Sequence, residues 1–98
     1  MIVVRNVFRL KFGKAKDAKA LIQEGAALMK KYENVTPRLL TDVTGEFYTL
    51  VMEMEYENLT AFEKRAKENM GTKEVAEWYQ RFVPLVDSGS REIFMVIT

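Results

Sequence analysis

Asn6 is the first residue of this chain whose type and position suggest chemistry. It interrupts an apolar alternation in which Ile2, Val4, Phe8 and Leu10 occupy the other even-numbered positions. A buried amide that lacks a hydrogen-bond partner costs about 1–3 kcal/mol. Asn6 therefore either bonds a neighbouring group of the protein or holds a ligand in a pocket under the helices, and its type and position leave both interpretations open.

Aromatic side chains form the second group of candidates. Trp78, Tyr79 and Phe82 share one predicted helix, and this spacing is more often typical of core packing than of a ligand site. A buried Trp or Tyr nevertheless needs a hydrogen-bond partner, which suits the edge of a pocket. The candidate ligand-binding residues are Asn6, Tyr48, Phe62, Trp78, Tyr79 and Phe82.

No residue can be assigned a catalytic role from its type. The chain has no Cys and no His, which removes thiolate nucleophiles, the commonest general base and the usual zinc and haem ligands. Tyr48, Tyr56, Arg65 and Arg81 could bind an acidic molecule. They are poor bases at neutral pH, because Tyr has an ordinary pKa near 10 and Arg does not titrate. We expect no metal, haem or flavin cofactor.

Length and charge exclude several classes of protein. The chain has 98 residues, with 15 Lys and Arg against 14 Asp and Glu, so residues 1–98 are predicted to form one domain. A net charge of +1 gives no general attraction to nucleic acid or to an anionic membrane. The N-terminus lacks signal-peptide features, and no apolar run is long enough to span a bilayer. We expect a cytoplasmic protein without nucleic-acid or membrane partners.

The periodicity of apolar residues predicts an α+β domain with a ferredoxin-like βαββαβ order. Alternation predicts strands, and a repeat at three and four predicts helices. In the first helix this repeat forms one apolar stripe of Ala18, Leu21, Ile22, Gly25, Met29 and Tyr32. Asn58 and Thr72 are expected helix caps, and Pro84 is expected in the last helical turn. The predicted elements are strand 2–12, helix 14–34, strands 35–43 and 47–56, helices 58–70 and 72–86, loop 87–90 and strand 93–97. In this topology both helical segments cover one face of an antiparallel sheet.

The other sheet face also carries apolar residues. By parity it presents Val3, Val7, Phe47 and Val51, and a sheet that is apolar on both sides usually has both sides covered. A homodimer through this helix-free face is therefore predicted. The charged residues of the same face are expected to form ion pairs across neighbouring strands; these are Arg5, Arg9, Glu53 and Glu55.

The C-terminal part of the chain resembles a known superfamily. Residues 78–86 and 89–93, together with the element order, resemble NIPSNAP-like and antibiotic-biosynthesis-monooxygenase-like members of the dimeric α+β barrels. The resemblance implies two sheets packed face to face and a ligand between sheet and helices. It also implies a pocket Asn on the first strand, matching Asn6, and a pocket aromatic on a helix segment that corresponds to Phe62. Haem-degrading relatives use an axial His, which this chain lacks.

Two functions remain open. The first is a small homodimeric protein that binds an apolar or aromatic molecule between sheet and helices, without chemistry. The second, which the resemblance implies, is a cofactor-independent monooxygenase-like enzyme acting on an electron-rich small molecule. The residue types favour the first, because no acid or base is expected to be buried.

Overall fold

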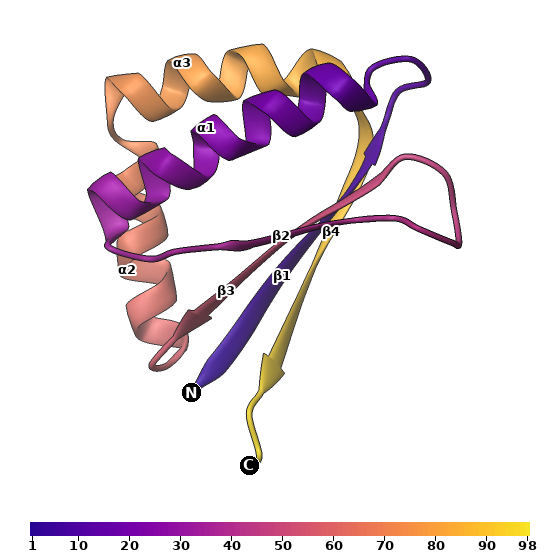
Figure 1. Cartoon of the computed structure of the whole chain (residues 1–98). Coiled ribbons are helices and arrows are strands. Elements are labelled where there is room, and N and C mark those ends of the chain that lie inside the picture. The colour runs from indigo at the N-terminus through magenta and orange to yellow at the C-terminus, as the bar shows by residue number, and fades with distance from the viewer.

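A four-stranded antiparallel sheet in the order β2-β3-β1-β4 organises the chain. The computed structural model describes residues 1–98 and contains, in sequence order, β1 (Ile2–Leu10), α1 (Ala15–Glu33), β2 (Arg38–Thr41), β3 (Thr49–Tyr56), α2 (Leu59–Met70), α3 (Lys73–Phe82), a short 3₁₀ turn (Val83–Leu85) and β4 (Val86–Met95) (Figure 1). This is the predicted ferredoxin-like order, with the first and third strands in the centre of the sheet.

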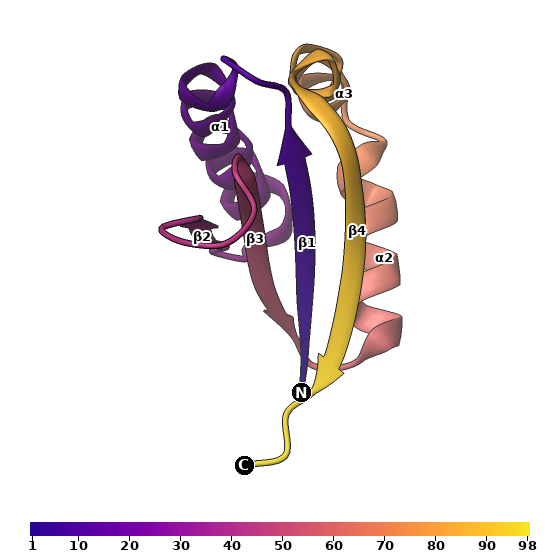
Figure 2. The same cartoon turned by 90° about the vertical axis from the view of Figure 1, so that its right-hand side faces the viewer.

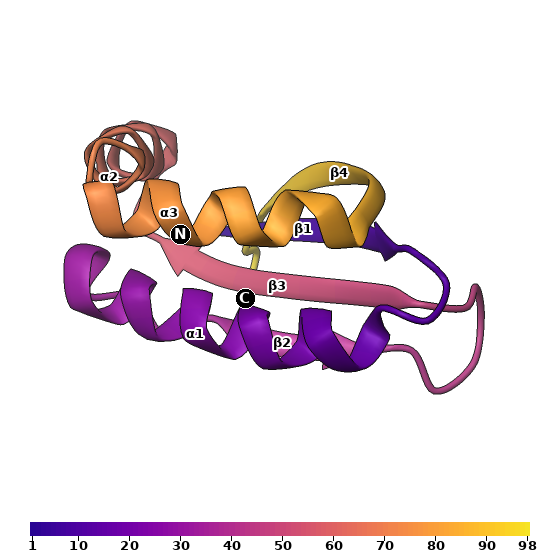
Figure 3. The same ribbon diagram turned by 90° about the horizontal axis from the view of Figure 1, so that it is seen from above.

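The helices lie on one side of the sheet, as predicted. Figure 2 views the molecule with the helices behind the strands. From above, α1 and α3 run side by side over the sheet, and α2 turns away at one end (Figure 3). The even-numbered residues of β1 face the helices, and so do the buried residues of β3 that pair with them. Val4 pairs with Met54, and Phe8 pairs with Leu50.

The core lies between this sheet face and the helices. Its most completely buried large side chains are Val4, Ile22, Leu50 and Phe82, each at most 2% exposed. Burying a side chain of this size contributes about 1.5–3 kcal/mol. The alternation of β1 and β3 and the helical repeat of α1 therefore converge on one apolar layer, which fixes where a pocket can form.

Helix α1 follows the predicted stripe except at its end. Ala18, Ile22, Gly25 and Met29 are buried as expected, but the last buried residue is Glu33 rather than the predicted Tyr32. Four residues separate Glu33 from Met29, so both lie on one helix face.

Strand β4 starts earlier than predicted, and the expected loop at residues 87–90 is wrong. These residues pair with β1, with Ser88 opposite Arg9 and Gly89 opposite Phe8. A Cβ at Gly89 would lie 3.3 Å from both the Phe8 ring and the Val7 carbonyl oxygen, so glycine permits this close approach. Pairing with a central strand has overridden the turn-like composition of the segment.

Strand β3 starts later than predicted. It begins at Thr49, and Tyr48 has a positive φ of 61°, a conformation that breaks strand alternation. Phe47 is therefore outside the strand and 77% exposed, and its predicted place on the helix-free face is wrong.

The second helical region is broken at Gly71 and capped as expected at its start. Asn58 Oδ1 accepts a 2.8 Å hydrogen bond from the Ala61 N–H. Thr72 occupies the N-cap position of α3, but its side chain makes no capping bond. Pro84 lies in the 3₁₀ turn that ends the helix.

None of the helices combines the length and the apolar character needed to cross a membrane. The expected cytoplasmic location stays a prediction.

Candidate functional site

A cavity of about 420 Å³ lies between the sheet and the three helices. Most of its wall is apolar, and its polar groups come from β1, β3, β4 and the ends of α1 and α2. Cavities of this size and character are typical sites for small organic molecules.

An aromatic pair forms one wall of the cavity. Trp78 stacks on Phe82, with ring centroids 5.0 Å apart and an interplanar angle of 14°, and the Phe82 ring meets Phe8 edge-on at 5.1 Å. Trp78 Nε1 donates a 2.6 Å hydrogen bond to the Leu21 carbonyl oxygen, which supplies the partner that a buried indole needs. A Cβ at Gly25 would overlap the Trp78 ring, so this glycine lets α1 approach the indole.

Asn6 is bonded to a residue of the neighbouring strand. Its Oδ1 accepts a 2.7 Å hydrogen bond from Nε of Arg91, which lies directly opposite it in the β1–β4 register. The Arg91 guanidinium also lies over the Phe62 ring, 5.2 Å from its centroid. All three residues line the cavity. The amide oxygen is thus satisfied within the protein, while Asn6 Nδ2 donates to no group of the chain.

A buried acid, which the sequence analysis did not expect, also lines the cavity. Glu33 is 6% exposed, and its Oε1 accepts a 2.8 Å hydrogen bond from the Tyr56 hydroxyl. Burial raises the pKa of Glu33. The hydrogen bond from Tyr56 and the charge of Arg65 lower this pKa and so partly oppose the effect of burial. Burial and the bond to Glu33 raise the pKa of Tyr56. The inference that no acid is buried was wrong, because Tyr32 had been assigned the last position of the helix stripe.

Five of the six predicted candidates are brought together at the cavity. Asn6, Phe62, Trp78 and Phe82 line it, and Tyr79 lines it at the rim, being 46% exposed. Tyr48 is not among the lining residues. Its ring packs edge-on against Phe12 at 5.0 Å.

Four polar lining residues were not predicted. They are Glu33, Asn69, Ser90 and Arg91. Asn69 Oδ1 is buried with no hydrogen-bond partner in the chain, a condition that costs about 1–3 kcal/mol. Only Glu33 had a sequence signal, its spacing of four from Met29. No three acidic side chains are grouped so that they could hold a metal ion.

Replacing Glu33 with Gln should change how stability depends on pH. The folded state binds the Glu33 proton more tightly than the unfolded state does, so this group lowers stability as pH rises above its ordinary value of 4.5. Gln keeps an oxygen for the Tyr56 hydroxyl and does not ionise. Urea unfolding at pH 4 and pH 7 should therefore show Glu33→Gln gaining stability relative to wild type at the higher pH. A Glu33→Gln variant that is less stable than wild type at pH 7, relative to pH 4, would contradict the raised pKa of Glu33.

Solved structures of NIPSNAP proteins and of antibiotic-biosynthesis-monooxygenase proteins have the same fold as this chain. A NIPSNAP domain protein from Burkholderia xenovorans aligns with a TM-score of 0.90 and 16% identity, over 99% of this chain and 95% of that one. A NIPSNAP family protein from Agrobacterium tumefaciens aligns with a TM-score of 0.88 and 18% identity, over 96% and 90%.

SnoaB from Streptomyces nogalater, a cofactor-independent oxygenase, is also similar in structure. It aligns with a TM-score of 0.75 and 12% identity, over 99% of this chain and 93% of its own. No family model matches the sequence, and no curated protein does. At these identities the likeness establishes the shared fold, and the predicted resemblance is confirmed at that level.

Proposed function

We propose that this protein binds a small, mainly apolar or aromatic molecule in the cavity between sheet and helices. The observation that carries the proposal is the cavity itself, about 420 Å³ in volume and lined by 19 residues of which 12 are hydrophobic. Moving apolar ligand surface out of water contributes about 25 cal/mol per Å². The polar groups at the cavity, Asn6 with Arg91 and Glu33 with Tyr56, would orient the ligand.

A neutral aromatic probe tests this binding. 1-Naphthylacetamide should shift the NMR resonances of Trp78 and Phe62 with a Kd near 1 mM or below, an affinity of about −4 kcal/mol. Ala66 lines the cavity on α2, so Ala66→Trp should fill the space and weaken binding about tenfold or more. Ala76→Trp is the matched control, because Ala76 is an exposed residue of α3. Equal binding to both variants would place the probe elsewhere.

Glu33 favours the second candidate function, a cofactor-independent oxygenase. Such a reaction needs an electron-rich substrate that loses a proton to give a stabilised anion, which then reacts with dioxygen. Glu33 lines the cavity and its Oε2 makes no hydrogen bond within the chain, so it would be the base. Dioxygen uptake with a polyhydroxylated aromatic substrate, lost in Glu33→Gln, would support this function.

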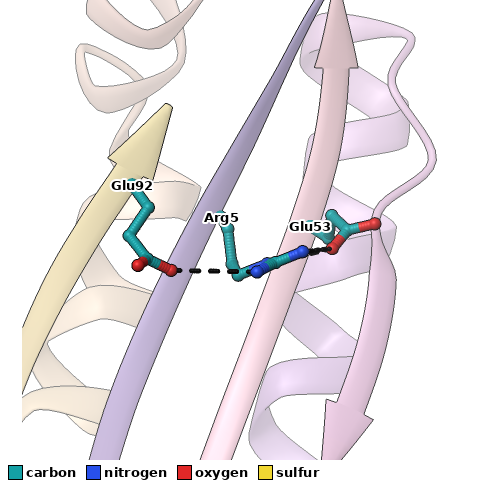
Figure 4. Close-up of polar contacts among 3 residues, drawn as sticks. All are labelled: Arg5, Glu53 and Glu92. Carbon is teal, nitrogen blue, oxygen red and sulfur yellow. Dashed lines mark hydrogen bonds and ion pairs between the residues drawn. The ribbon is translucent and has the colours of Figure 1, made fainter. Parts of the chain in front are cut away.

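We also propose a second copy of the chain as the partner of the helix-free face, defined here by the odd-numbered residues of β1 and their cross-strand neighbours. One row of this face alternates in charge across all four strands, from Arg38 through Glu53 and Arg5 to Glu92. Arg5 lies 3.0 Å from Glu53 and 3.9 Å from Glu92 (Figure 4). Such a row is neutral overall and complementary to its own copy.

The expected ion pairs of this face are present in part. Arg5 pairs with Glu53 as predicted, but Arg9 pairs with Glu46, at 2.8 Å, and Glu55 forms no ion pair. Arg9 is drawn instead toward the turn before β3, where its Nη1 also donates to Thr49.

The next row of the helix-free face is apolar on three strands, with Leu40, Val51 and Val7 in register, and ends at Ser90 on β4. Phe94 adds an aromatic ring that is 47% exposed and lies 5.3 Å from the Arg5 guanidinium carbon. Arg5 and Arg9 already have acidic partners in the same chain, so covering the centre of the face with a second copy would bury apolar surface without leaving either of these cations unpaired. Arg38, on the edge strand β2, makes no ion pair within the chain and is free to pair with the second copy.

A further inference from the structure

The rim of the cavity formed by Asn6 and Arg91 presents mainly hydrogen-bond donors. Asn6 Oδ1 is occupied by Nε of Arg91 at 2.7 Å, so the amide offers Nδ2 to the cavity. Nη1 and Nη2 of Arg91 likewise donate to no group of the chain. A guanidinium has no acceptor, and Arg91 is exposed, so these three nitrogens are free to donate to water or to the acceptor of a ligand that displaces it.

The Arg91 side chain is held in place for such a contact. The bond to Asn6 fixes one edge of the guanidinium, and the buried ring of Phe62 supports its face at 5.2 Å. A cation over an aromatic face is attracted by the ring quadrupole. The free edge has the planar fork geometry that binds two oxygens of one carboxylate.

We infer that the ligand is an amphiphilic oxyanion, an aromatic carboxylate whose head group binds Arg91 and Asn6 and whose ring enters the apolar cavity. The inference rests on the proposed function, since it names the chemistry of the molecule bound there. The one acid that lines the cavity, Glu33, is engaged by other groups. The Glu33 carboxylate already accepts from Tyr56, and Arg65 lies close enough to act on the charge of Glu33.

Two probes that differ by one charge separate this inference from the proposed function. 1-Naphthylacetate and 1-naphthylacetamide have nearly the same shape, and only the first carries an oxyanion. Isothermal titration calorimetry should give a Kd about tenfold or more lower for the acetate, because hydrogen bonds to charged groups are worth about 1.5–3 kcal/mol.

Variants of Arg91 test whether this residue causes the preference for the acetate over the acetamide. Arg91→Gln should bring the two dissociation constants together, while Arg91→Lys, which keeps the charge, should retain part of the preference. Arg81→Gln is the matched control, because Arg81 is exposed and pairs with Glu24 on the outside of the helices.

Equal binding of the two probes to wild type, or an unchanged preference in Arg91→Gln, would overturn the inference and leave the proposed function standing. If neither probe binds at concentrations up to about 5 mM, both proposals fail. If Arg81→Gln also loses binding of the acetate, the preference is a general effect of charge, and the assignment of the carboxylate site to Arg91 is overturned.

Discussion

Phe82→Ala is expected to lower the free energy of unfolding by about 3–5 kcal/mol, the usual cost of truncating a buried Phe. Phe82 is 2% exposed, stacks on Trp78 and meets the ring of Phe8 edge-on. Truncation would leave Trp78 without its stacking partner and would enlarge the cavity at this wall. Urea unfolding followed by circular dichroism measures the loss.

Tyr79→Ala is the matched comparison for this change. Tyr79 belongs to the same helix, lines the same cavity and is 46% exposed. Its truncation should cost about 1 kcal/mol, the typical value for a point substitution. A similar loss in the two variants would contradict the placement of Phe82 in the core and of Tyr79 at the rim.

Val7→Glu is expected to dissociate the proposed homodimer, raising its dissociation constant about 100-fold or more. Val7 lies in the apolar row of the helix-free face on a central strand. The nearby cations, Arg5 and Arg9, already pair with Glu53 and Glu46, so the new carboxylate would be buried without a partner. Such a charge costs about 3–5 kcal/mol.

Sedimentation velocity at micromolar concentration measures this effect. Wild type should sediment at twice the 11.4 kDa chain mass, and Val7→Glu as a folded monomer. Leu59→Glu is the control, because Leu59 is an exposed apolar residue of α2 and should leave the dimer intact. A monomeric wild type, or a Val7→Glu protein that stays dimeric, would refute the proposed interface.

The local patterns of apolar residues in the sequence were sufficient to predict the layers of this fold. The alternation of β1 and β3 identified Val4 and Leu50 as residues that face the helices, and the stripe of α1 identified Ile22. The burial of these residues depends only on which face of their own helix or strand is apolar. The start of β4 depends instead on the neighbouring strand, β1, with which it pairs. Gly89 and its neighbours have turn composition and become a strand because β1 is available for pairing.

The polar part of the site was visible in the sequence only where a residue broke a local pattern. Asn6 stood out because it is polar in an apolar alternation. Arg91 did not, because an Arg on an edge strand is ordinary until the register places it opposite Asn6. Glu33 was missed because Tyr32, one position earlier, fits an apolar stripe better by residue type. Packing of the helix end against Tyr56 decided which of the two is buried.

The pairing of Asn6 with Arg91 has a consequence for folding kinetics. The two residues are 85 positions apart in the sequence, and contacts between such distant segments form late, because loop closure costs chain entropy before the contact stabilises anything. We therefore expect the donor rim of the cavity to form after the folding transition state. A ligand that needs this rim would stabilise the native state alone. It would slow unfolding and leave the refolding rate unchanged, so its occupancy would set how long each folded molecule lasts rather than how fast it forms.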